Sequence, residues 1–211
     1  MSDPYLIYFA DPMCSWCYGF GPELDSVLRS RPQLRVELVM GGLRPYTAEA
    51  ATPAFRETIA GHWAQVAQES GLPFNDAALA RDGFVYDTEP ACRAVVTARA
   101  RDPARALPYL KRVQQAFYVE GRDVTSADVL ADLAADVGLD RAAFLAAHGS
   151  EASREAVRND FSATQQTGVT GFPTLAAGYP PQRFFLVTAG YARAAEIADR
   201  LERIHAIAQI D

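Results

Sequence analysis

The sequence predicts an α/β protein in which two sheet-forming ends of the chain enclose a long helical segment. Two apolar runs near the N-terminus flank a stretch with helical spacing, and this order predicts a β-α-β unit. Two further runs near the other end are separated by turn-forming residues and precede an amphipathic helix, which predicts a β-β-α unit. The four expected strands lie at 5–9, 34–40, 173–177 and 183–187, with the turn at 178–181.

The segment between these units, from residue 44 to about residue 149, is rich in alanine and has almost no β-branched runs. Polar residues that suit helix N-caps divide it into several expected helices: Thr52, Asn75, Thr88, Asp140, Ser150 and an approximate capping box at 125–128. The helix after Asn75 is expected to end near Gly83. A chain of 211 residues fits one domain carrying an insertion. We therefore expect a discontinuous domain of residues 1–43 and 151–211, interrupted by an all-α domain of residues 44–150.

Composition and charge argue against several classes of partner. Hydrophobic residues make up 49% of the chain, so a sizeable core can form without disulfides. The net charge of -6 gives no reason to expect a nucleic acid or an anionic membrane surface as partner. No apolar stretch approaches the roughly 20 residues that span a bilayer. Residues 1–4 lead into the first strand without a basic or apolar leader, and three cysteines are too few for a disulfide scaffold, so the expected location is cytoplasmic.

The sequence Cys14-Ser15-Trp16-Cys17 stands where the first strand gives way to the first helix. Thiols at a helix N-terminus lie near the positive end of the helix dipole and near unpaired amides, which stabilise a thiolate. In such positions the pKa of a cysteine falls from about 8.5 to roughly 3.5–7.5. We therefore expect Cys14 to be the exposed catalytic nucleophile and Cys17 the resolving thiol of a redox-active dithiol. Because Ser15 and Trp16 carry no charge, we do not expect an extreme oxidant.

Zinc binding is the alternative interpretation of this cysteine pair. Four ligands would require Cys92 and a histidine, but no paired ligand spacing links Cys92 with any of His62, His148 and His205, so no metal is predicted. Cys92 lies among small apolar residues and is expected in the buried core, with a redox or substrate-contact role as the alternative. Glu37 could accept a proton behind Cys17, but a solvent-facing position on the second strand is favoured.

A second motif, Gly171-Phe172-Pro173-Thr174, places a proline where a strand begins. Such a proline cannot donate to the strand ladder and belongs at an edge or a turn. The residues alone favour an ordinary trans bond, because only about 5–6% of such bonds are cis in folded proteins. A cis bond would turn the Phe172 backbone outward, where it could pair with an extended peptide.

Taken together, these motifs resemble the DsbA family of the thioredoxin superfamily over nearly the whole chain. The segments 11–17, 41–43 and 89–94 are similar, more narrowly, to its cytosolic FrnE-like branch. The resemblance implies a thioredoxin-like fold with an inserted helical domain, a cis Pro173 beside the disulfide, and protein-disulfide oxidoreductase activity. Two features differ from relatives: no cysteine follows Cys92, where some branch members carry a second pair, and Ser15-Trp16 replaces the Pro-His of periplasmic DsbA.

The expected function is therefore disulfide reduction, isomerisation or oxidation of protein or peptide substrates through a mixed disulfide. Substrate contacts are expected from Ser15, Trp16, Phe172 and Pro173. No cofactor is expected, although glutathione remains open as a redox partner near Pro173. Kappa-class transferases and related glutathione-dependent isomerases resemble the same layout but usually carry serine in place of the first cysteine, so Cys14 and Cys17 argue against them. A non-catalytic peptide-binding chaperone is the third alternative.

Overall fold

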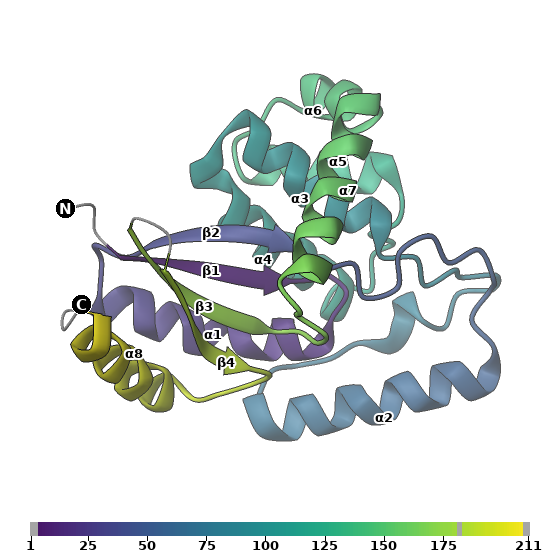
Figure 1. Cartoon of the computed structure of the whole chain (residues 1–211). Helices are drawn as coiled ribbons and strands as arrows, with labels where there is room; N and C mark the ends of the chain where they lie inside the picture. The colour runs from purple at the N-terminus through teal and green to yellow at the C-terminus, as the bar shows by residue number, and fades with distance from the viewer. Residues whose placement is uncertain (1–3, 181–182, 209–211) are drawn as a thin grey trace.

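A four-stranded sheet forms the centre of the protein in a computed structural model that describes residues 4–180 and 183–208 (Figure 1). Its strand order is β2-β1-β3-β4, with β1 and β2 parallel and both other pairs antiparallel. The expected β-α-β and β-β-α units are therefore confirmed, although Pro181 of the expected turn lies outside the described residues. The strands are β1 (Tyr5–Ala10), β2 (Arg35–Met40), β3 (Thr174–Tyr179) and β4 (Arg183–Ala189).

Two helices belong to these units. α1 (Ser15–Ser30) connects β1 to β2, and its buried face includes Phe20, Leu24 and Val27. α8 (Ala194–Ala208) follows β4 and packs against α1, β3 and β4. The helical spacing of apolar residues correctly predicted both buried faces, because burial of an amphipathic stripe stabilises such helices more than intrinsic propensity does.

The remaining helices lie between these two units in the chain, and the last of them (Glu151–Gln166) begins just after the predicted end of the insertion at residue 150. Figure 1 shows α3, α5, α6 and α7 gathered beside β2, whereas α2 runs apart from them and packs against α1. The elements are α2 (Pro53–Ser70), α3 (Glu89–Arg101), α4 (Ala106–Tyr118), α5 (Ala127–Asp136), α6 (Arg141–His148) and α7 (Glu151–Gln166), with short 3-10 turns at Asp76–Ala78 and Pro103–Arg105. The domain boundaries at 44 and 150 stay a prediction. None of the helices in the described part of the chain is long and apolar enough to cross a lipid bilayer.

Four of the expected N-caps are confirmed by side-chain hydrogen bonds to the first helical turns: Thr52, Asn75, Asp140 and Ser150. The expected helix from Asn75 to Gly83 is wrong in length, since only the 3-10 turn Asp76–Ala78 forms. Thr88 and Ser126 stand at the starts of α3 and α5 but make no side-chain cap. The Thr88 hydroxyl instead accepts a hydrogen bond from the Arg44 backbone amide at 3.1 Å, so a partner distant in sequence outcompetes the local one.

Helices α3 and α7 cover the outer edge of β2. The Asp160 carboxylate of α7 accepts a hydrogen bond from the Met40 amide at 2.8 Å and binds the Arg99 guanidinium through both oxygens. Arg99 also donates to the Leu38 carbonyl, and the Thr164 hydroxyl donates to the Met40 carbonyl at 3.2 Å. Side chains thus pair the backbone groups that an edge strand would otherwise leave open.

Candidate active site

The dithiol lies at the junction between β1 and α1. Asp11, Pro12 and Met13 form the turn, Cys14 occupies the N-cap position with extended backbone angles, and α1 begins at Ser15. The Cys14 amide donates to the Asp11 carbonyl at 3.1 Å, which fixes the turn. Cys14 and Cys17 are both free thiols and are in hydrogen-bonding contact with one another. The strand–turn–helix setting predicted for this pair is confirmed.

The two sulfur-bearing side chains differ in accessibility. Cys14 is 5% exposed and Cys17 is 0% exposed. The prediction that Cys14 is exposed is therefore wrong, although Cys14 is the more accessible of the two thiols, as expected. Burial raises the pKa of Cys17 well above its usual value, and the hydrogen bond with Cys14 and the charge of Cys14 raise it further. Cys17 is consequently held as a protonated, inaccessible thiol behind its partner.

The loop before β3 covers Cys14. The Cys14 thiol donates to the Phe172 carbonyl at 3.5 Å, across 158 positions of sequence. The Phe172–Pro173 peptide bond is cis, so the expectation from the family resemblance is confirmed and the trans expectation from the residues alone is wrong. The Pro173 carbonyl accepts a hydrogen bond from the Gly190 amide at 2.7 Å, which ties the loop to the end of β4. Phe172 and Pro173 thus border the dithiol directly.

The side chains between the two cysteines face outward. Ser15 and Trp16 are both half-buried, and the Trp16 ring packs against Tyr191 with ring centroids 5.7 Å apart. The Tyr191 hydroxyl donates to Glu23 at 3.1 Å. Tyr191 was not singled out from the sequence; its position directly after Gly190 at the end of β4 was the available signal. An aromatic pair, Trp16 and Tyr191, therefore lies close to the dithiol.

Asp11 is a buried carboxylate, whereas from the sequence it was named only as the first residue of the segment 11–17. Its side chain is 0% exposed and accepts hydrogen bonds from the Met13 amide at 2.8 Å and the Leu43 amide at 2.7 Å. The Thr88 hydroxyl and the Cys92 thiol, at 3.3 Å, are the other two donors. Burial raises the pKa of Asp11, and these four donors oppose that rise. The carboxylate joins the dithiol turn to the β2–α2 loop and to α3.

The other residues weighed from the sequence lie away from the reacting sulfurs or support them. Cys92 is fully buried, as expected, and burial raises its pKa; its contact with Asp11 was not expected. Glu37 is exposed on β2, as favoured, so it is not the buried group behind Cys17. Within residues 4–180 and 183–208, no three His, Cys, Asp or Glu side chains are grouped closely enough to hold a metal ion.

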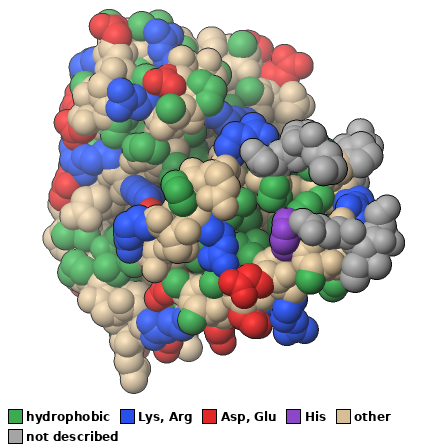
Figure 2. Space-filling model, turned by 90° about the vertical axis from the view of Figure 1, so that its left-hand side faces the viewer, with side chains coloured by type: hydrophobic (Ala, Val, Ile, Leu, Met, Phe, Trp, Pro, Cys, Tyr) green, Lys and Arg blue, Asp and Glu red, His purple; other side chains and the backbone are tan. Residues whose placement is uncertain are grey.

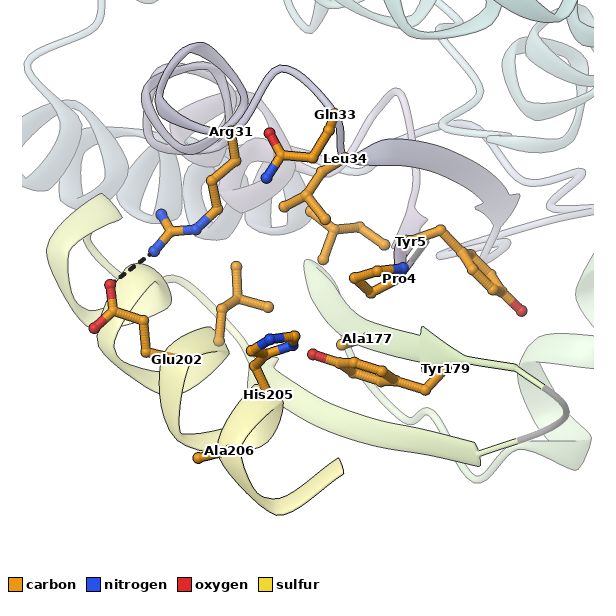
Figure 3. A pocket seen from close by; sticks show the side chains of 12 residues that line it. Pro4, Tyr5, Arg31, Gln33, Leu34, Ala177, Tyr179, Glu202, His205 and Ala206 are labelled. Carbon is orange, nitrogen blue, oxygen red and sulfur yellow. Dashed lines mark hydrogen bonds and ion pairs between the residues drawn. The ribbon is translucent and has the colours of Figure 1, made fainter. Parts of the chain in front are cut away.

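Two hollows mark the surface at opposite ends of β3. A groove of about 490 Å³ runs beside the Phe172 loop and is lined by residues 167–172, Thr174, Leu186, Ala189 and Gly190. A second hollow of about 510 Å³ lies among β1, β3, the end of α1 and α8, where Arg31 pairs with Glu202 at 3.0 Å (Figure 3). Figure 2 looks at the molecule from the side of the chain ends and shows hydrophobic and basic side chains interspersed there. Of these two hollows, the first is lined by Phe172, whose carbonyl accepts the hydrogen bond from Cys14.

A dithiol at a helix N-terminus, bordered by a proline loop on this sheet, defines a thioredoxin fold with a helical insertion. The family model described as DSBA-like thioredoxin domain matches residues 5–202. The chain therefore belongs to the family of DsbA-like thioredoxin domains. Its assignment to the FrnE-like branch stays a prediction.

Several solved structures share this architecture. A protein from Nitrosomonas europaea, described as a candidate protein disulfide isomerase, is 34% identical with a TM-score of 0.88, over 96% of this chain and 97% of that one. The cytosolic disulfide reductase DsbM from Pseudomonas aeruginosa is 29% identical with a TM-score of 0.78, over 98% and 100%. A structure of DsbM with glutathione gives 30% identity and a TM-score of 0.76, over 96% and 98%.

Curated relatives are more distant. The ClpXP adapter protein SpxH of Halalkalibacterium halodurans is 25% identical over 177 residues, which are 81% of this chain and 58% of the relative. SpxH of Shouchella clausii is 26% identical over 174 residues, 81% and 57%. This chain spans less than two thirds of the length of either relative.

Proposed function

We propose that the protein is a thiol–disulfide oxidoreductase that acts on protein or peptide disulfides. The observation that supports this most directly is the pair of contacting free thiols of unequal burial at the start of α1. The amides at a helix N-terminus favour negative charge, which suits Cys14 to attack as a thiolate. Cys17, which is buried behind it, suits the resolving role.

The reaction follows two balanced exchanges. The Cys14 thiolate attacks one sulfur of a substrate disulfide, forms a mixed disulfide and expels the other sulfur as a thiolate. Cys17 then attacks the Cys14 sulfur, and its proton passes to the departing substrate thiolate, so the substrate gains two electrons and the protein holds a Cys14–Cys17 disulfide. A thiol reductant returns the protein to the dithiol state. The reverse sequence oxidises a substrate dithiol.

Substrate contacts are proposed around Cys14. Phe172 and Pro173, with the groove beside them, form one set, and Ser15 and Trp16, with Tyr191, form the other. We further propose glutathione as the reductant and reduction or isomerisation in the cytoplasm as the working direction. The DsbM structure with glutathione and the cytosolic assignment of that neighbour support both proposals.

Reduction of insulin disulfides, with glutathione as the electron source, tests the proposal. Cys14→Ser is expected to abolish turnover, and Cys17→Ser is expected to trap a mixed disulfide that non-reducing electrophoresis detects. Cys92→Ser retains a hydrogen-bond donor toward Asp11 and is the matched control, with turnover near that of the unmodified protein. Equal loss of turnover in the Cys14 and Cys92 variants would contradict the assigned roles.

The same Cys14→Ser variant separates the alternatives. A glutathione-dependent isomerase activity that survives this substitution would support the transferase-like alternative. Suppression of aggregation that survives without turnover would support the chaperone alternative. A measured Cys14–Cys17 potential near that of DsbA, about -120 mV, would contradict the expectation of a moderate redox pair.

A further inference from the structure

The hydroxyl of Tyr8 is buried directly behind the resolving cysteine. Tyr8 lies within β1, is 2% exposed, and packs its ring against Phe20 of α1 with centroids 5.7 Å apart. Its hydroxyl lies 3.4 Å from the Cys17 carbonyl oxygen and is also in hydrogen-bonding contact with the Cys17 thiol. The hydroxyl therefore donates to the Cys17 carbonyl and has the sulfur of the same residue as a second acceptor within reach.

The resolving step places negative charge on the buried sulfur of Cys17. Cys17 must become anionic in order to attack Cys14, yet its side chain has no contact with solvent. In the dithiol state the charged groups that face Cys17 are Cys14 at the start of α1 and Asp11 in the β1–α1 turn, and the charge of each disfavours a second anion. In the mixed disulfide the Cys14 sulfur is neutral, so the Asp11 charge is the one that opposes a Cys17 thiolate. The Asp11 backbone amide favours the anion. Tyr8 of β1 is a further hydrogen-bond donor, because its hydroxyl is in contact with the Cys17 thiol.

We propose that Tyr8 is a positioning residue for the resolving step, whose hydroxyl turns from the Cys17 carbonyl to the Cys17 sulfur when that sulfur becomes anionic. A hydroxyl proton rotates freely to suit its acceptor, and hydrogen bonds to ionised acceptors are the stronger ones. Burial and the charges of Cys17 and Cys14 raise the pKa of Tyr8 well above its usual value, so the phenol stays protonated. It donates a hydrogen bond without taking the proton of Cys17, which still passes to the departing thiolate. This inference rests on the proposed function.

The test separates the two exchanges with Ellman's reagent, 5,5′-dithiobis(2-nitrobenzoate), in stopped flow. Attack by Cys14 releases the first nitrothiobenzoate, and attack by Cys17 on the mixed disulfide releases the second. Tyr8→Phe removes only the hydroxyl. The second phase is expected to slow by about tenfold or more, the usual worth of a hydrogen bond to a charged group. Its pH profile is expected to move to higher pH, while the first phase keeps its rate.

Tyr109→Phe is the matched control. Tyr109 is 0% exposed, and its hydroxyl donates to the Leu130 carbonyl at 2.8 Å within the insertion, so the variant removes an equally buried hydroxyl far from the dithiol. Its two phases are expected to match those of the unmodified protein. A Tyr8→Phe second phase as fast as that of the control would overturn the inference, and so would equal slowing of both phases. Should Tyr8→Phe not fold, site-specific 3-fluorotyrosine at position 8, a stronger donor, is expected to accelerate the second phase; an unchanged rate would overturn the inference.

Failure of the proposed function gives a different result. If the unmodified protein releases a single equivalent and forms no Cys14–Cys17 disulfide, the dithiol mechanism itself is wrong. If it releases two equivalents and Tyr8→Phe behaves as the control does, only the role of Tyr8 is wrong.

Discussion

Gly41 is the position at which a single methyl group should disturb the site. It follows β2 directly, and its amide donates to the Ala10 carbonyl at 2.8 Å, so its backbone is fixed beside the end of β1. A Cβ atom at Gly41 would lie 2.0, 2.1 and 2.7 Å from three atoms of the Phe172 ring. Ordinary contact begins near 3.4 Å, so in Gly41→Ala the nearest ring atom must move by about 1.4 Å, the difference between 3.4 and 2.0 Å.

This displacement has a structural and a functional consequence. Overpacking of this kind costs about 1–3 kcal/mol of the free energy of unfolding. We expect this displacement of the ring to reach the Phe172 carbonyl, which faces Cys14 at 3.5 Å. Because a shift of about 1 Å in a positioning group can cost roughly a hundredfold in rate, we expect kcat/KM for insulin reduction to fall by about 10- to 100-fold. The Cys14–Cys17 potential is expected to change little, because the dithiol turn does not contact the new methyl group.

Three measurements check the reasoning: urea denaturation, insulin reduction kinetics and the redox potential. Gly171→Ala is the matched control, because Gly171 precedes Phe172 in the same loop and a Cβ atom there meets nothing within 4 Å. It is expected to retain both stability and activity. If Gly41→Ala matched this control in kcat/KM, Phe172 would not need its observed position for turnover.

Two further predictions concern buried titratable groups. Burial and the charge of Arg93 lower the pKa of His148 from 6.5 to about 4. The unfolded chain therefore binds this proton at higher pH than the folded protein does. The stability that neutral His148 confers is complete above pH 6.5 and is lost, up to roughly 3 kcal/mol, as the pH falls toward 4. Urea denaturation at pH 4.5 and 7 should show this loss. His148→Gln should abolish this pH dependence. Asp11→Asn turns one acceptor into a donor that faces other donors, so we expect it to lower the free energy of unfolding by about 1–3 kcal/mol. Removal of that negative charge should also lower the pKa of Cys17, measured by the pH dependence of iodoacetamide labelling in the Cys14→Ser background; an unchanged profile would show that the Asp11 charge does not reach Cys17.

The parts of the fold that could be predicted depend on local patterns. Helical spacing after Cys17, alternating apolar runs and N-cap residues such as Thr52 and Asp140 act within a few positions of the chain. The pairing of β1 with β2 follows from the right-handed β-α-β connection that such units adopt. These features require no knowledge of distant contacts, and the structure confirms them.

The remaining features of the site depend on contacts between distant segments. The Cys14 thiol is 5% exposed and donates to the carbonyl of Phe172, which lies 158 positions away. The role of Asp11 as an acceptor depends on Leu43 and Cys92, which lie 32 and 81 positions away. The Asp11-Pro12 pair predicts that a strand ends there. It does not indicate which distant residues will donate hydrogen bonds to the Asp11 carboxylate. The partners of the Gly41-Gly42-Leu43 segment are equally distant in sequence, since Gly41 lies against the Phe172 ring and the Leu43 amide donates to Asp11.

The contacts of Asp11 also show why the insertion matters for the dithiol. A buried carboxylate is costly unless hydrogen-bond donors compensate it, and two of its four donors, Thr88 and Cys92, come from the start of α3. Tyr86, just before α3, donates to the Met13 carbonyl at 2.5 Å and so holds the same turn from the other side. The residues that fix the turn before Cys14 therefore belong largely to the insertion. In energetic terms the helical insertion is part of the active-site turn, because its absence would leave the Asp11 charge buried with half of its donors missing.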